Sequence, residues 1–126
     1  MKHALVLSAL LLAAPAQAQT ILNPDDMAGW DYPEQVAATL PPVRNALDPK
    51  AAQFRYIRRG KPTPGRRSWC GEVNLKNRYG GYVGFRPYVV VVDVTRPKGK
   101  EETVWLADGS ADEDALVRGV QKANGC

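Results

Sequence analysis

Ser68–Val94, SWCGEVNLKNRYGGYVGFRPYVVVVDV, contains the strongest structural signals of the chain. Its second half contains the unbroken apolar run Val89–Val92, which is typical of a strand that is buried on both faces. Its first half mixes apolar and polar residues, and the pair Gly80-Gly81 between the halves is a turn signal. The stretch therefore predicts a β-hairpin whose second strand lies in the middle of a sheet.

The register of this hairpin decides which side chains share a face. A two-residue turn at Gly80-Gly81 would place Leu75 opposite Arg86 and mix apolar with charged groups. A three-residue loop over 79–81 places Leu75 opposite Phe85 and puts apolar and charged side chains on different faces, so we prefer this register. It turns Val73, Leu75, Val83 and Phe85 inward. The candidate outer face then contains Glu72, Asn74, Lys76, Arg78, Tyr82, Arg86 and Tyr88.

Three interpretations of this outer face are open. It can be a solvated surface with internal ion pairs, a surface that binds a ligand or partner, or a catalytic site. Catalysis by Glu72 would resemble glycan cleavage and would need a second carboxylate about 5–10 Å away. Asp93 lies on the next strand segment, but no spacing argument brings it to Glu72.

The core CGEVNLKNRYGGYVGF, Cys70–Phe85, resembles a family of small exported bacterial proteins of unknown function that share the pattern CGEVN-x-KN-x-x-GGY-x-GF. An upstream segment, Asp48–Arg55, is similar to the DP-x-SA-x-F-R of that family, with Ala51 where serine is usual. The resemblance implies an exported single domain and no established activity. The matching signature positions are Cys70, Glu72, Asn74, Lys76, Asn77, Gly80, Gly81, Tyr82, Gly84 and Phe85.

The chain begins MKHALVLSALLLAAPAQA, which predicts a signal peptide over residues 1–18. A short basic start precedes the apolar run Ala4–Ala14, and a small-x-small triplet follows. The run is too short to span a bilayer, and no later segment is long enough, so we expect a periplasmic or secreted protein without a membrane span. In an oxidising compartment, Cys70 and Cys126 favour one intramolecular disulfide over free thiols or a bridge between chains.

Helix signals lie on both sides of the hairpin. Residues 19–30 predict an extended lead-in, and Asp31 with Glu34 three residues later marks a helix start. An apolar stripe follows, interrupted by Pro41-Pro42, so we expect two short helices or one kinked helix up to residue 47. The stripe contains Val36, Leu40, Val43 and Leu47.

The remaining segments complete an α+β domain over residues 31–126. Residues 53–59 alternate apolar and basic residues and predict a short strand. Ser110 with Glu113 three residues later predicts a C-terminal helix. We expect an antiparallel sheet of about four strands, with the helices covering one face and the polar hairpin face left open.

The composition argues against several kinds of catalytic and metal-binding site. The one histidine, His3, lies in the predicted signal peptide, so a Ser-His-Asp or Cys-His system and the usual zinc sites are not expected. Phosphate-binding loops are absent, and helix capping accounts for the acids of Ala107–Ala115 without calcium, so we predict no cofactor and no metal. A net charge of +4 and a basic loop without aromatic residues give no strong nucleic-acid signal.

These observations favour an exported, non-catalytic binding or interaction module of the cell envelope. Its expected partner is an envelope component, a glycan or another protein. The residues expected to contact this partner are Glu72, Asn74, Lys76, Arg78, Tyr82 and Arg86. The alternatives are a small carboxylate-dependent hydrolase using Glu72 and a purely structural envelope protein.

Overall fold

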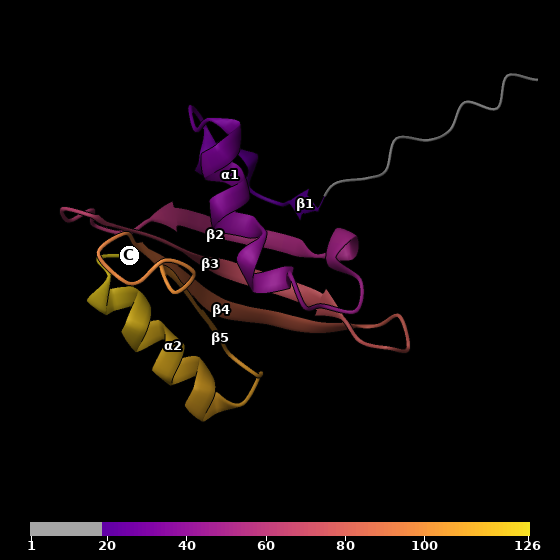
Figure 1. The fold of residues 1–126 in the computed structure, drawn as a ribbon. Coiled ribbons are helices and arrows are strands. Elements are labelled where there is room, and N and C mark those ends of the chain that lie inside the picture. The colour runs from indigo at the N-terminus through magenta and orange to yellow at the C-terminus, as the bar shows by residue number, and fades with distance from the viewer. Residues whose placement is uncertain (1–18) are drawn as a thin grey trace, which may run out of the picture.

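The computed structural model describes residues 19–126, so the predicted signal peptide lies outside the described residues. One sheet, with strand order β1-β2-β3-β4-β5, forms the centre of the molecule (Figure 1). Neighbouring strands of the sheet are antiparallel, except that β1 runs parallel to β2. The predicted α+β class is confirmed. The strands are β1 (Thr20–Ile21), β2 (Gln53–Arg59), β3 (Arg66–Lys76), β4 (Tyr82–Asp93) and β5 (Glu102–Leu106).

The two predicted helix starts are confirmed by their caps. Asp31 Oδ1 accepts a hydrogen bond from the backbone N–H of Glu34 at 2.8 Å, and Ser110 Oγ accepts one from Glu113 at 3.3 Å. Each cap satisfies an amide that the first turn leaves without a partner. The helical elements are η1 (Pro24–Met27), α1 (Tyr32–Thr39), η2 (Pro41–Val43), η3 (Pro49–Ala51) and α2 (Ala111–Ala123).

The predicted apolar stripe of the N-terminal segment is wrong at Leu40 and Leu47 and right at Val43. Leu40 and Leu47 are 40% and 76% exposed, whereas Val43 is fully buried. The tandem prolines end α1 and start the separate turn η2, so the helical period does not continue across them. The side of α1 that faces the sheet contains Glu34, Ala38 and Thr39.

Both faces of the sheet are covered, which corrects the expectation of one open face. The N-terminal helical segments lie on one face and α2 lies on the other (Figure 1). Alternate residues of β4 therefore enter different clusters: Tyr88 and Val90 pack with the N-terminal segments, and Val89 and Val91 pack with Val117 of α2. An unbroken valine run requires apolar cover on both sides.

The predicted disulfide is confirmed and joins β3 to the end of α2. Cys70 and Cys126 are bonded with their Cα atoms 6.3 Å apart, and both belong to the cluster on the α2 face. Buried Gln121 of α2 donates from Nε2 to the carbonyls of Gly71 and Tyr88 at 3.0 and 3.2 Å. The bridge and the amide fix α2 against the two central strands.

Gly71 allows the close approach of a buried ring. A Cβ at Gly71 would lie 2.8 Å from Cε1 of Tyr88, which is its direct cross-strand partner. The Tyr88 ring is fully buried, contacts Phe54 edge to face, and donates its hydroxyl to the carbonyl of Ala38 at 2.8 Å. Burial raises the pKa of the Tyr88 phenol well above its ordinary value.

The predicted hairpin register is wrong. The loop has three residues, but they are 78–80 rather than 79–81, because Asn77 N–H donates to Gly81 O at 2.8 Å. A bulge at Gly84, φ 103°, then shifts the pairing to Asn74 with Phe85 and Val73 with Arg86. Leu75 packs against the core on the N-terminal side, whereas Phe85 lies on the α2 side.

Candidate binding surface

A strained tyrosine interrupts β2. Tyr56 has a φ of 56° and is the one non-glycine residue with positive φ in the described part of the chain. The register between β2 and β3 shifts between Arg55 and Arg58, so Phe54 and Ile57 both turn inward while Tyr56 stays 52% exposed. A bulky residue in this region costs about 1–3 kcal/mol, and such strain is concentrated at functional sites.

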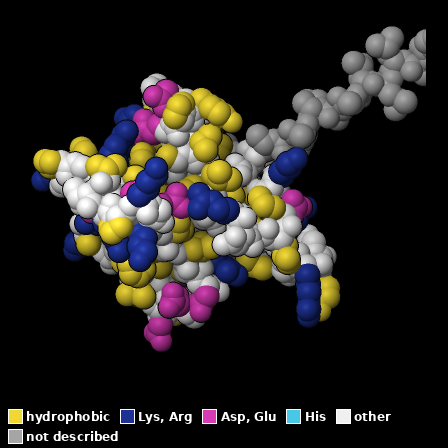
Figure 2. Space-filling model, viewed as in Figure 1, with side chains coloured by type: hydrophobic (Ala, Val, Ile, Leu, Met, Phe, Trp, Pro, Cys, Tyr) yellow, Lys and Arg dark blue, Asp and Glu magenta, His cyan; other side chains and the backbone are white. Residues whose placement is uncertain are grey.

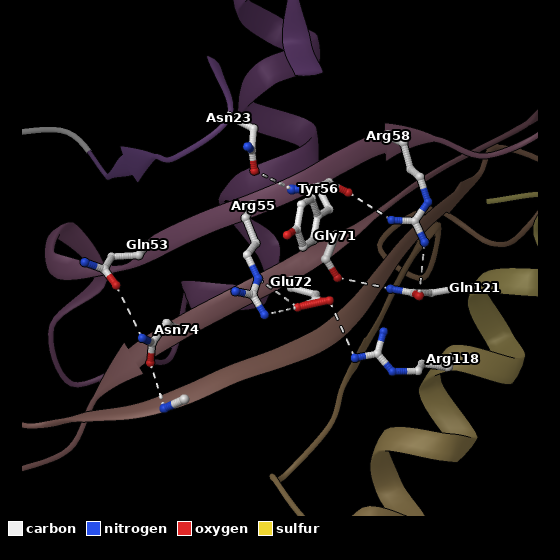
Figure 3. A network of polar contacts seen from close by, with 11 residues as sticks. Asn23, Gln53, Arg55, Tyr56, Arg58, Gly71, Glu72, Asn74, Arg118 and Gln121 are labelled. Atoms are coloured by element: carbon white, nitrogen blue, oxygen red, sulfur yellow. Dashed lines mark hydrogen bonds and ion pairs between the residues drawn. The ribbon is translucent and has the colours of Figure 1, made fainter. Parts of the chain in front are cut away.

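Side chains of the N-terminal segment hold this bulge. Asn23 Oδ1 lies 3.4 Å from the backbone N–H of Tyr56, and Asp26 Oδ2 accepts from the N–H of Ile57 at 3.1 Å. Arg58 donates to the carbonyl of Tyr56 at 2.9 Å and to Gln121 at 3.3 Å (Figure 3). The backbone polar groups around the exposed Tyr56 side chain are therefore hydrogen-bonded.

Glu72 fixes two arginines beside the bulge. Its carboxylate Oε1 accepts from Nε and Nη2 of Arg55 at 3.0 and 2.8 Å, and its Oε2 lies 3.5 Å from Nη2 of Arg118 (Figure 3). The Glu72 side chain is 10% exposed, while those of Arg55 and Arg118 are 35% and 51% exposed. The acid is thus nearly buried, and the two cations reach the surface.

Two aromatic rings flank Arg55. Its guanidinium carbon lies 3.8 Å from the Phe85 ring centroid and 5.1 Å from that of Tyr56, which is cation–π geometry. We call this group, which holds three arginines, one carboxylate and two rings, the arginine–tyrosine surface. It consists of Arg55, Tyr56, Arg58, Glu72, Phe85 and Arg118.

Basic side chains are prominent on the side of the molecule seen in Figure 1. Figure 2 shows Lys and Arg side chains gathered over the middle of the sheet, and acidic side chains gathered at the start of α2, where the first turn holds Asp112, Glu113 and Asp114. The arginine–tyrosine surface carries three arginines against one carboxylate, so it favours an anionic ligand.

The residues predicted to form the outer face of the hairpin do not come together. Glu72 pairs with Pro87, whereas Arg86 pairs with Val73 and so lies on the opposite face of the sheet. The Nε of Arg86 is buried, with no hydrogen-bond partner among the described residues. Tyr88 is fully buried rather than exposed. The shifted register causes all of these differences.

Asn74 has a structural role beside Glu72. It is 8% exposed, its Oδ1 accepts from the N–H of Gly84 at 2.9 Å, and its Nδ2 donates to Gln53 at 3.3 Å. The amide therefore closes the bulge that resets the register. The same contact leaves Asn74 little surface for a ligand.

The other predicted residues lie toward the hairpin tip. Lys76 pairs with Tyr82, its Nζ 5.4 Å from the ring, and the Tyr82 hydroxyl donates to the carbonyl of Ala51 at 2.8 Å. Arg78 lies over Tyr79 at 5.0 Å and donates to its hydroxyl at 3.0 Å. This tip pair is separate from the arginine–tyrosine surface.

A second acid, which the sequence suggested only as a helix-start residue, lies on the other face of the sheet. Glu34 accepts from Arg59 at 2.7 and 2.8 Å, from Arg67 at 3.0 Å and from the indole N–H of Trp69 at 3.2 Å. The hydrogen bonds from Arg59 are the largest of the effects that lower the pKa of Glu34 from 4.5 to about 2, against the opposing effect of burial. With all these donors on a side chain 8% exposed, Glu34 joins α1 to β2 and β3.

The geometry does not bring Asp93, the acid considered as a second carboxylate, close to Glu72. Asp93 pairs with Arg66, and positions 66 and 72 are about 20 Å apart along β3 at about 3.3 Å per residue. Glycan hydrolysis requires about 5–10 Å. Within residues 19–126, no group of three or more His, Cys, Asp or Glu side chains could hold a metal ion.

The key residues of the surface, Arg55, Tyr56 and Arg118, were not among the predicted site residues. The alternation over 53–59 predicts a plain strand, and no local pattern indicates a bulge at Tyr56. Comparison of the chain with known proteins finds no matching protein family, no matching curated protein and no matching solved structure. Among residues 19–126, none of the helices has the length and hydrophobicity that spanning a bilayer requires.

Proposed function

We propose that this protein is an exported, non-catalytic binding module of the cell envelope that contacts its ligand with the arginine–tyrosine surface. The observation that carries the proposal is Tyr56. A tyrosine held at positive φ, with its ring exposed and its backbone braced by Asn23 and Asp26, is costly for stability alone. Export is supported by the pattern of residues 1–18 and by the disulfide.

The chemistry of the surface fits an anionic glycan. Arginine forks bind carboxylates and phosphates with paired hydrogen bonds, and Arg118 has half of its side chain exposed for this. The Tyr56 ring beside Arg55 offers a flat apolar face to a sugar ring. Because Glu72 already orients Arg55, less conformational entropy is lost when a ligand binds there.

A hydrolase that uses Glu72 is less well supported. Oε1 of Glu72 is occupied by two donors of Arg55, and Oε2 faces Arg118. Neither oxygen is free to meet a substrate, and Asp93 is too distant to assist. Glu72 therefore serves better as a residue that positions arginines.

The test is co-sedimentation of the protein, purified after export with its disulfide intact, with peptidoglycan sacculi and separately with lipopolysaccharide. The double variant Tyr56→Ala/Arg118→Ala should weaken binding at least about tenfold, and binding should fall as salt rises. The matched control is Arg78→Ala/Tyr79→Ala, which removes an equivalent pair from the hairpin tip and should bind as the unaltered protein does.

Three outcomes would contradict the proposal. The first is that the protein binds neither anionic polymer. The second is that the surface variant binds as well as the tip variant. The third is that the purified protein cleaves a glycan and Glu72→Gln abolishes this activity. A purely structural role would instead change the melting temperature of the surface variant without any ligand being bound.

A further inference from the structure

The outer edge of β5 has free backbone groups. The bonds from Asp93 N–H to Glu101 O at 2.8 Å and from Ala107 N–H to Pro87 O at 3.2 Å fix the alternation of the antiparallel ladder. Residues 101, 103, 105 and 107 therefore bond to β4, and residues 102, 104 and 106 direct their N–H and C=O groups away from it. Within residues 19–126, no hydrogen bond reaches these outward groups.

Apolar surface borders this edge on the N-terminal face of the sheet. A groove of about 320 Å³ runs between η2 and β5, and its lining includes Pro41, Pro42, Leu75, Val104 and Leu106. A strand added beside β5 would place its alternate side chains next to Val104 and Leu106, at the outer side of this groove.

Apolar surface also borders the edge on the α2 face. Trp105 is 40% exposed and Leu116 of α2 is 52% exposed. Arg118 turns toward Glu72 on β3, and residue 116 lies about 200° around the helix from it, so Leu116 lies on the β5 side of α2. An incoming strand would meet apolar groups on both of its faces.

We propose that β5 pairs with β5 of a second copy of this chain, antiparallel and across a two-fold axis, to form one continuous sheet. The partner strand must be apolar on both faces, and β5 is such a strand, with Val104 and Leu106 on one face and Trp105 on the other. A two-fold axis perpendicular to the sheet joins like faces, so each apolar border meets its equivalent.

The pairing with the longest overlap is centred on Val104. Val104 exchanges two hydrogen bonds with Val104 of the partner subunit, and Trp105 lies opposite Thr103 of the partner subunit, an aromatic and β-branched pair. The charge nearest to the axis is already neutralised, because Arg44 donates to both carboxylate oxygens of Glu102 at 2.7 and 3.3 Å. The two copies therefore approach without repulsion between free carboxylates.

The experiment measures the molar mass of the exported, disulfide-intact protein by light scattering and sedimentation across a concentration series. We expect a reversible dimer. Val104→Pro removes the outward N–H and no bond of the β4–β5 ladder, a position where an edge strand tolerates proline. This variant should raise the dimer Kd at least about tenfold. Val104→Thr keeps the N–H and the shape of the side chain, and should remain dimeric.

A second pair of variants keeps the inference testable if Val104→Pro folds poorly. Trp105→Lys should also weaken the dimer, whereas Val83→Lys, at a site that is 43% exposed near the hairpin tip, should not. A protein that stays monomeric up to about 100 μM, or a dimer that survives both edge variants, would overturn the inference. Capture of a different protein by a monomeric β5 edge would overturn it too.

Discussion

Replacing Glu34 by glutamine should remove the part of the stability of this protein that depends on the ionised Glu34 carboxylate, and therefore on pH. The folded pKa of Glu34 is about 2 against an ordinary 4.5, a shift that corresponds to at most about 3–4 kcal/mol. Its partners Arg59 and Arg67 are 51% and 58% exposed, so solvent screening reduces this to roughly 1–2 kcal/mol. Because the folded pKa is depressed, the contribution is complete above about pH 4.5 and is lost as the pH falls toward 2.

The assay is urea unfolding of the unaltered protein and of Glu34→Gln at pH 7, 4.5, 3 and 2. The difference in the free energy of unfolding should be roughly 1–2 kcal/mol at pH 7 and should shrink steadily below pH 4.5. The matched control is Glu102→Gln, in an ion pair with Arg44 whose side chains are 34% and 52% exposed, and it should cost less than about 1 kcal/mol.

Two results would refute the reasoning about Glu34. A difference that stays constant from pH 7 to pH 2 would show that its charge does not contribute to stability. A Glu34→Gln protein as stable as the unaltered one at pH 7 would show that the contacts with Arg59, Arg67 and Trp69 only balance the cost of burying the carboxylate.

Three further predictions concern stability. Removing the disulfide with Cys70→Ser/Cys126→Ser should cost about 4 kcal/mol in urea unfolding, because the bridge closes a separation of 56 residues; a cost below about 1 kcal/mol would contradict this. Tyr88→Phe should cost about 1–2 kcal/mol in the same assay, because it leaves the buried carbonyl of Ala38 without its donor, and an unchanged midpoint would argue against that bond. Tyr56→Gly should leave the melting temperature unchanged or raise it, because glycine adopts a positive φ without strain; the expected gain in the free energy of unfolding is at most about 1 kcal/mol. A clear drop in the melting temperature would mean that the Tyr56 ring stabilises the fold.

The parts of the fold that could be predicted depend on strong local signals. The valine run of β4, the capping residues Asp31 and Ser110 and the cysteine pair each have one dominant physical cause that is visible in a short window. The short parallel strand β1 has no such signal, because its two residues are in a strand only through pairing with β2.

The hairpin register could not be predicted from apolar segregation, because polar contacts decide it. Asn77 Oδ1 accepts from the N–H groups of Tyr79 and Gly81 at 2.9 and 3.1 Å, which fixes the loop at 78–80. Asn74 then accepts from Gly84 and holds the bulge. These bonds outweigh the preference for apolar partners, and a one-residue slip moves Arg86 to the other face.

The candidate surface could not be predicted from the sequence for a related reason. A bulge at Tyr56 is stabilised by Asn23 and Asp26, which are about 30 positions earlier in the chain and carry no pattern linking them to β2. The sequence identifies Glu72 as an acid among basic residues. Its partners Arg55 and Arg118 become visible only once β2 and α2 are placed on either side of it.

The contact between Gly71 and the Tyr88 ring has an evolutionary consequence. Since no side chain fits at position 71 while a tyrosine occupies position 88, the two positions should change together. Descendants of this sequence that acquire alanine at 71 should be viable only after position 88 has become smaller. The substitution order along such a lineage is therefore constrained, and the pair Gly71→Ala with Tyr88→Leu should be better tolerated than Gly71→Ala alone.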